Sequence, residues 1–414
     1  MKNSVGDKLI PLVTKFTNLK FIKAMQKGVT AGFGATVAGS IFMLLMTPPF
    51  TANMTGGFIE AWRSFSANNA EWLNLAYQMT MGMVSLFTLF GVTFAACEEE
   101  KMRPVNALVV SFIFFGIVSA NLVEGTFDLG FFGAKGLMCA IVVGFIVPEL
   151  IHFLEEHGFK IKLPDTVPPF VAEPISAMIV DIIVIGLACG VRLACGQTLL
   201  PALINKVFSP LFIAGDSFVA VFVYCLVVRL LWFCGIHGGN VAGAIINPII
   251  TMNMVENADA YVAGEPLPHI FTSGFNSWTV MGMLAICVAM MISCKSQQLK
   301  AVSKIAIAPA IFNIGEPITF GLPIVMNFAI LIPYLLIFVI DGCVPYFLTE
   351  IGFLGRSYIG VPYTLPAIVK VFLTSMDYKA IIVYIILFII NVAIMIPWLK
   401  KYDKQLLEKE AAGE

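Results

Sequence analysis

Long apolar stretches are the feature of this sequence that most restricts its fold. Nine stretches hold about twenty mostly apolar residues each, the length that a helix needs to cross a bilayer. They cover residues 28–47, 73–96, 105–123, 136–154, 174–195, 215–234, 277–294, 327–347 and 381–399. Only 12% of all residues are charged, about half the share found in soluble domains. The sequence therefore predicts an integral membrane protein and excludes a soluble enzyme.

Three further apolar stretches are interrupted by glycine, proline and polar residues. They cover residues 235–255, 305–325 and 358–374. Irregular backbone at membrane depth is tolerated only where it is buried in protein or lines a wet cavity. We therefore expect an all-α integral membrane protein with about ten transmembrane helices plus re-entrant hairpins.

The distribution of lysine predicts the orientation. The first 27 residues carry six lysines against one acid, Asp7, and the last 15 residues carry four lysines. The segments 50–72 and 124–133 hold almost no lysine or arginine. Since cytoplasmic loops are enriched in these two residues, we expect both termini in the cytoplasm and these two loops outside.

A polar, proline-rich segment at residues 155–173 predicts a boundary between two membrane regions. We expect four regions along the chain: a basic cytoplasmic segment at 1–27, an N-terminal membrane region at 28–170, a C-terminal membrane region at 171–399 and a cytoplasmic tail at 400–414.

The segment 313–323, with the sequence NIGEPITFGLP, is the strongest candidate for a functional site. Two glycines and two prolines prevent a regular helix there. Glu316 places a carboxylate in the middle of this apolar surrounding, where ionisable groups are costly and usually functional. A structural kink or a cytoplasmic loop is the alternative. A re-entrant hairpin that binds solute is the favoured interpretation.

The second candidate is the segment 234–240, with the sequence CGIHGGN. His237 is flanked by glycines, which let a ligand approach the backbone closely. A packing role is the alternative for a lone histidine. Together with Glu316, Asn240 and Asn313, it forms a set of donors and acceptors suited to hydroxyl groups. The residues themselves therefore predict the transport of a polyhydroxylated solute.

The remaining polar residues indicate no other chemistry. The nine cysteines lack the spacing of zinc ligands, and no basic stripe predicts nucleic-acid binding, so we expect no metal, no cofactor and no nucleic acid. Glu98–Glu100 is expected in a solvated cytoplasmic loop, and three histidines near span ends are expected to be solvated. These are His152, His157 and His269. The sequence gives no partners for three of the charged residues that lie within spans, Arg192, Arg229 and Asp181.

Several motifs resemble one transporter family. They are SCKSQQLK at 293–300, APAIFNIGEP at 308–317, GLPIVMN at 321–327, AGEPLPHIFT at 263–272 and GIHG at 235–238. The chain resembles the membrane (IIC) components of the lactose/cellobiose/diacetylchitobiose phosphotransferase systems, over essentially its whole length.

The resemblance implies a multi-pass sugar transporter of the bacterial cell membrane, embedded in lipid. It implies a homodimer whose interface lies in region 28–170, with the sugar bound in region 171–399. The sugar would be phosphorylated during uptake by a phosphocysteine on a separate cytoplasmic IIB protein, which is itself supplied by a IIA protein. Whether this chain counts as an enzyme is therefore left open.

The resemblance also assigns roles. Glu316 would bind sugar hydroxyls, and His237 would contact the hydroxyl that receives the phosphoryl group and could act as its base. Asn240, Asn313, Tyr363 and Thr364 would complete the site. The sugar would be a disaccharide such as cellobiose, lactose or diacetylchitobiose.

Three positions depart from the family's pattern. Tyr363 stands in the motif VPYT (361–364), where members commonly carry tryptophan. TVMG (279–282) replaces a Gly-Ser-Gly, and Asn327-Phe328 replaces an Asn-Pro. The exact sugar therefore does not follow from the resemblance.

Two other functions stay open on the residues alone. One is an ion-coupled sugar symporter, in which Glu316 would take the proton or cation. The other, a membrane enzyme acting on lipid-linked sugar, is disfavoured because no interfacial loop carries a pair of acidic residues.

Overall fold

The structure is a computed structural model that describes residues 11, 15–50, 53–161, 163 and 168–412. By packing, the described residues between Lys15 and Leu211 form one compact unit, the N-terminal unit, and residue 11 and the described residues from Phe212 onwards form another, the C-terminal unit. This division concerns packing alone. The regions predicted from the sequence, with their boundary after residue 170, stay a prediction about function.

The N-terminal unit is almost entirely helical. Its elements are α2 (Lys20–Ala31), α3 (Phe33–Met46), α4 (Gly57–Asn68), α5 (Ala70–Thr80), η1 (Met81–Met83), α6 (Val84–Glu99), α7 (Pro104–Ser119), β1 (Asn121–Val123), β2 (Thr126–Asp128), η2 (Ala134–Gly136), α8 (Leu137–Glu156), α9 (Pro169–Cys195) and α10 (Leu200–Gly215), the last of which continues past Leu211.

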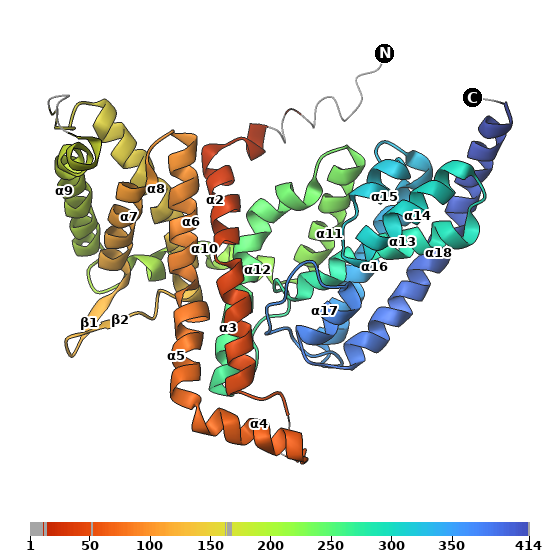
Figure 1. Cartoon of the computed structure of the whole chain (residues 1–414), viewed down its shortest axis with the longest axis horizontal. Coiled ribbons are helices and arrows are strands. Elements are labelled where there is room, and N and C mark those ends of the chain that lie inside the picture. Colours follow the sequence, from red (N-terminus) through yellow and green to blue (C-terminus); the bar gives the residue numbers. More distant parts are fainter. Residues whose placement is uncertain (1–10, 12–14, 51–52, 162, 164–167, 413–414) are drawn as a thin grey trace. The chain divides into compact units, whose positions relative to one another are not determined.

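Helix α6 lies at the centre of this unit, between α2, α7 and α8, and α9 packs on α7 (Figure 1). The contact between α2 and α6 is unusually close at Gly28. A Cβ atom on Gly28 would lie 2.1 Å from Val92 Cγ2 and 2.5 Å from the Val92 backbone nitrogen. Glycine therefore permits the backbones of the two helices to meet, as small residues do in membrane helix pairs.

Charged residues join α2 to the C-terminal end of α6. Lys23 Nζ lies 3.2 Å from Glu99 Oε2, Lys27 Nζ lies 2.8 Å from Glu98 Oε2, and Lys20 pairs with Glu100. The expectation of a solvated loop at Glu98–Glu100 was wrong, because α6 continues to Glu99 and faces the basic side of α2.

A short hairpin follows α7. The apolar stretch 105–123 was expected to be helical throughout, but α7 ends at Ser119 and Asn121–Asp128 forms the antiparallel pair β1–β2. Glu124 and Gly125 form the turn with φ of 50° and 83°, the left-handed conformation of the tight turns that connect such strands.

The C-terminal unit consists of helices, several of them short or broken. Its elements are α11 (Phe218–Phe233), α12 (Gly238–Ala263), η3 (Phe275–Val280), α13 (Gly282–Ser293), α14 (Gln297–Ile311), α15 (Glu316–Gly321), α16 (Phe328–Glu350), α17 (Ala367–Leu373) and α18 (Lys379–Ala412).

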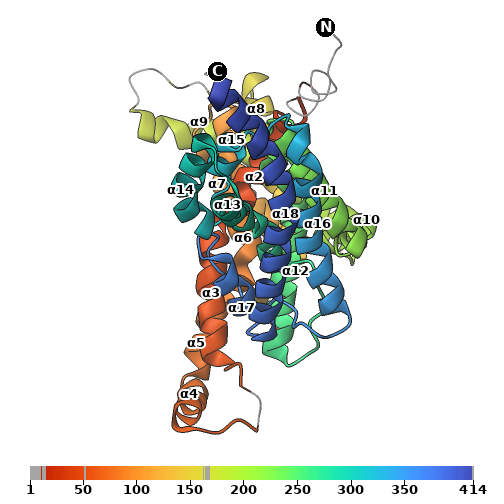
Figure 2. The same ribbon diagram turned by 90° about the vertical axis from the view of Figure 1, so that its right-hand side faces the viewer.

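Helices α11 and α16 pack antiparallel along their whole length. The rings of Phe233 and Phe328 lie 5.1 Å apart at one end, and those of Phe218 and Tyr346 lie 5.9 Å apart at the other. Helix α18 packs against both α16 and α13, as both views show (Figures 1 and 2). This framework carries the broken segments between its helices.

The predicted fold class is confirmed. Among the described residues, seven helices are long and apolar enough to cross a membrane, and the bent pair α10–α11 makes up to eight. Helix α7, with 16 residues, is apolar but shorter. Each of the nine unbroken stretches thus corresponds to a helix or helix pair, in agreement with the expected fold class.

The three charged residues for which the sequence gave no partners bind neutral groups. Asp181 accepts a hydrogen bond from Asn106 Nδ2 at 2.8 Å, and Arg192 donates one to Asn121 Oδ1 at 2.5 Å. Arg229 donates to the Thr279 carbonyl at 2.7 Å, and its guanidinium lies 3.4 Å from the Phe338 ring centroid.

Candidate functional site

His237 connects α11 to α12 and caps the second helix. Its Nδ1 accepts a hydrogen bond from the Asn240 backbone N–H at 3.1 Å. The turn depends on two glycines: Gly235 has φ 81°, and a Cβ on Gly238 would lie 2.0 Å from the Val228 carbonyl oxygen. The glycines found in the sequence therefore fix the position of the imidazole.

Glu316 is the first residue of the short helix α15. The turn before it is sharp, because Asn313 has φ 65°, a left-handed conformation that asparagine adopts more readily than most residues. A negative side chain in the first helical turn is stabilised by the partial positive charge of the helix N-terminus. Residues 312–315 thus form a tight turn between α14 and α15, and the interrupted sequence 313–323 contains α15 itself.

The two interrupted segments, which carry His237 and Glu316, lie next to each other. His237 Nε2 lies 3.9 Å from Glu316 Oε1, and both side chains are about half exposed, at 46% and 48%. The Met326 N–H donates to the Phe233 carbonyl at 2.9 Å, which joins the segment after α15 to the end of α11. The structure therefore brings together the two residues that the sequence singled out.

The third broken stretch reaches the same place. Asn313 Nδ2 donates to the carbonyl oxygens of Tyr363 (2.9 Å) and Leu365 (2.7 Å), and the Tyr363 hydroxyl donates to the Asn313 carbonyl at 3.1 Å. Asn313 is buried, whereas Tyr363 is 51% exposed. All three interrupted segments of the sequence thus converge in the C-terminal unit.

The other predicted site residues differ in what they can offer a ligand. Asn240 and Thr364 are exposed. The amide hydrogens of Asn313 are both used within the protein, so this side chain positions Tyr363 rather than donating to a solute.

Two residues that the sequence did not reveal also belong to this neighbourhood. The ring centroids of Trp232 and His237 lie 4.4 Å apart, and Lys370 Nζ lies 4.6 Å from the centroid of the Tyr363 ring. A tryptophan five positions before a glycine-flanked histidine was a usable signal. A lysine within an apolar helix was another.

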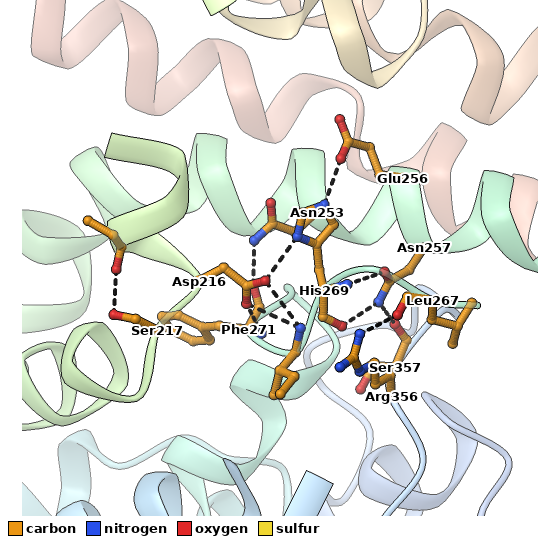
Figure 3. A network of polar contacts seen from close by, with 12 residues as sticks. Asp216, Ser217, Asn253, Glu256, Asn257, Leu267, His269, Phe271, Arg356 and Ser357 are labelled. Carbon is orange, nitrogen blue, oxygen red and sulfur yellow. Dashed lines mark hydrogen bonds and ion pairs between the residues drawn. The ribbon is translucent and has the colours of Figure 1, made fainter. Parts of the chain in front are cut away.

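His269 lies at the other end of the unit, beside the start of α11, and it is not solvated as expected (Figure 3). Its Nδ1 is 2.9 Å from Asp216 Oδ2 and its Nε2 is 2.6 Å from Glu256 Oε2. Burial lowers the pKa of His269, but the hydrogen bonds and negative charges of these two carboxylates outweigh burial and raise it to about 9. The backbone N–H of Phe271 also donates to Asp216 Oδ1, at 2.6 Å.

Known proteins with this sequence pattern form a defined family. The chain matches the family described as "Phosphotransferase system, EIIC" over residues 26–337. The chain belongs to this family. The resemblance in the sequence motifs is therefore confirmed.

Alignments with individual relatives cover nearly the whole EIIC chain. The chain is 30% identical to the lactose-specific EIICB component of Lacticaseibacillus casei, in an alignment that covers 100% of this chain and 73% of that protein. It is also 30% identical to the cellobiose-specific EIIC component of Geobacillus stearothermophilus, covering 98% and 95%. The crystal structure of ChbC, the IIC component of an N,N'-diacetylchitobiose-specific system, matches with a TM-score of 0.90 at 30% identity, covering 97% of this chain and 98% of that one.

Membership of the EIIC family establishes the broad function of this chain. The chain is a sugar transporter of a phosphotransferase system and a multi-pass protein of the bacterial plasma membrane. EIIC components bind sugar and work with IIB and IIA proteins. The ion-coupled symporter finds no support in these comparisons.

Proposed function

We propose that the EIIC chain binds a disaccharide where His237, Glu316 and Tyr363 meet, and presents one of its hydroxyls to a phosphocysteine on a IIB protein. Relatives named for lactose, cellobiose and diacetylchitobiose support a disaccharide. Tyr363 would stack on the apolar face of one pyranose ring, and the exposed side chains of Asn240 and Thr364 would contact further hydroxyls.

The observation that carries this proposal is the pair formed by His237 and Glu316. At 3.9 Å the imidazole nitrogen and the carboxylate oxygen are too far apart for a direct hydrogen bond. A hydroxyl oxygen placed beside both can accept a hydrogen bond from one and donate its proton towards the other. The pair thus has the geometry to hold and polarise a single hydroxyl.

The cap on α12 determines whether His237 or Glu316 can accept the proton of the sugar hydroxyl. Because His237 Nδ1 accepts the Asn240 N–H, a neutral ring carries its proton on Nε2, the nitrogen that faces Glu316. We therefore propose that His237 donates to the hydroxyl oxygen and that Glu316 accepts the hydroxyl proton. The family resemblance implied that His237 could act as the base, which would require the cap to break.

Little further chemistry is needed from the membrane protein. Phosphoryl transfer depends mainly on in-line positioning and on charge stabilisation. This chain would meet the need for positioning by holding the sugar hydroxyl in place and accepting part of its proton. The IIB protein would supply the phosphoryl group.

Equilibrium binding to the purified protein tests the proposal. Cellobiose, lactose and N,N'-diacetylchitobiose serve as probes, with glucose as the monosaccharide control. We expect at least one disaccharide to bind, and Glu316→Gln to weaken it by about 10- to 100-fold, since charge-assisted hydrogen bonds contribute about 1.5–3 kcal/mol. An unchanged affinity in Glu316→Gln would exclude this site.

We further propose that the protein is a homodimer whose interface lies in region 28–170, as the family resemblance implies. Crosslinking between cysteines introduced at exposed apolar positions of α3 and α5, such as Ile41 and Leu75, tests this. Crosslinks that form mainly between spans after residue 215 would contradict it.

A further inference from the structure

Lys370 is a buried cation in the neighbourhood of the proposed sugar site. It lies on the short helix α17 and is only 4% exposed. Its Nζ lies 3.5 Å from the Tyr363 carbonyl oxygen and 4.6 Å from the centroid of the Tyr363 ring. Both contacts are made with one residue, which is the proposed stacking platform.

This arrangement is costly for the fold. Burying an ammonium group without a counter-ion is unfavourable, and none of the ion pairs among the described residues includes Lys370. Helix α17 belongs to the interrupted stretch 358–374, which we expect at membrane depth, where ionisable groups are costly. A methionine would fill the same space without this cost, so packing alone does not account for a lysine.

The contacts instead explain how Tyr363 is oriented. Asn313 fixes the Tyr363 carbonyl and hydroxyl. The ring itself can still tilt about these points, and an ammonium over an aromatic ring adds a favourable contact that restrains it. Despite this, Tyr363 is 51% exposed, so part of the ring remains available to a ligand.

We propose that Lys370 is a positioning residue for sugar binding, which holds the Tyr363 ring in the orientation that stacks on the substrate. This inference rests on the proposed function. Lys370 has no direct contact with the sugar in this scheme and acts through Tyr363 alone.

The chain contains a matched control. Lys379 makes two contacts of the same kind with another aromatic residue: its Nζ donates to the Phe353 carbonyl and lies 5.2 Å from the Phe353 ring centroid. Unlike Lys370, it also pairs with a carboxylate, since its Nζ lies 3.5 Å from Asp377 Oδ2. No sequence or structural feature places Phe353 at the candidate site. Lys379→Met therefore removes a contact of the same kind, together with an ion pair, at an aromatic residue that has no proposed role in binding.

The experiment is a double-mutant cycle on the purified full-length chain. Equilibrium binding of the tightest of the three disaccharides is measured for wild type, Lys370→Met, Tyr363→Ala, the double variant and Lys379→Met, together with the Tm of each. We expect Lys370→Met to weaken binding by about 3- to 30-fold, the range that a buried cation–π contact supports. We expect an unchanged or higher Tm for it, and no effect of Lys379→Met on affinity.

The double variant gives the decisive result. If Lys370 acts through Tyr363, then Lys370→Met has no further effect once the ring is gone. An equal loss in the presence and absence of the ring, or no loss from Lys370→Met alone, would overturn the inference while leaving the platform intact. An unchanged affinity in Tyr363→Ala would instead reject the platform itself, and this inference with it.

Discussion

Asn313 and Tyr363 hold each other through two hydrogen bonds of opposite direction. The Asn313 amide donates to the Tyr363 carbonyl at 2.9 Å, and the Tyr363 hydroxyl donates to the Asn313 carbonyl at 3.1 Å. The two residues come from different broken segments, so each segment fixes the conformation of the other. The hairpin that carries Glu316 and the loop that carries Tyr363 are therefore expected to form as one structure.

Replacing Asn313 tests this mutual support. Asn313→Ala removes the amide that donates to the Tyr363 and Leu365 carbonyls and places alanine at φ 65°, so we expect a loss of stability of about 1–3 kcal/mol and weaker sugar binding. Asn313→Gly also lacks the amide but accepts the backbone conformation freely. Its Tm should lie between those of wild type and Asn313→Ala. If both variants bind sugar as wild type does, the link between the two segments has no role in the site.

The roles of His237 and Glu316 can be separated by comparing binding with phosphoryl transfer. Glutamine at position 237 keeps a donor, so His237→Gln should bind the disaccharide within a few-fold of wild type. If Glu316 accepts the proton, Glu316→Gln should lower the transfer rate from phospho-IIB at saturating sugar by about 10²- to 10⁴-fold, the usual value of base assistance.

The opposite result would restore the assignment made from the sequence. If His237→Gln keeps its affinity but loses transfer by that factor, His237 is the base and its cap must break during the reaction. If each variant loses binding and transfer in equal proportion, both residues only bind sugar.

The sequence pointed to the residues of the candidate site, whose role in sugar binding stays a prediction, but not to the connections around them. Glycine, proline and a lone ionisable residue in an apolar run are costly at membrane depth, so the positions of His237 and Glu316 could be read directly. Their proximity could not, because it depends on how α11, α15 and α16 pack, and on a backbone contact between Met326 and Phe233 that carries no sequence signal.

The residues that the sequence misjudged share one physical cause. Glu98–Glu100 and His269 were expected to be solvated because each is polar and near the end of a span. Their partners, the lysines of α2 and the carboxylates of Asp216 and Glu256, come from elements distant in the chain. Local patterns show that a residue is polar, whereas long-range packing decides whether water or another residue satisfies it.

Gly28 provides a test of packing in the N-terminal unit. Because a Cβ on Gly28 would meet both the backbone and the side chain of Val92, Gly28→Ala should destabilise the protein by about 1–3 kcal/mol, as overpacking does. Gly34 is the matched control, since nothing lies within 4 Å of the corresponding Cβ position. Thermal unfolding in detergent measures both variants. An equal Tm for Gly28→Ala and Gly34→Ala would show that α2 and α6 can separate without cost.

The cluster of Asp216, His269 and Glu256 predicts a dependence of stability on pH. The folded protein raises the pKa of His269 from its ordinary value near 6.5 to about 9. A group whose pKa is higher in the folded state binds its proton more tightly there, so protonation stabilises the fold. This contribution is fully present below pH 6.5 and is lost as the pH rises through about 9. The Tm of wild type should accordingly exceed that of His269→Gln most clearly at low pH.

The comparison must separate this effect from a general loss of packing. His269→Gln keeps a polar side chain but lacks the positive charge, so the difference in Tm from wild type should shrink steadily between pH 6.5 and pH 9.5. His157→Gln, which alters an exposed histidine of the N-terminal unit, controls for the removal of any imidazole. A difference in Tm that stays constant over this range would mean that His269 stabilises the loop by its shape rather than by its charge.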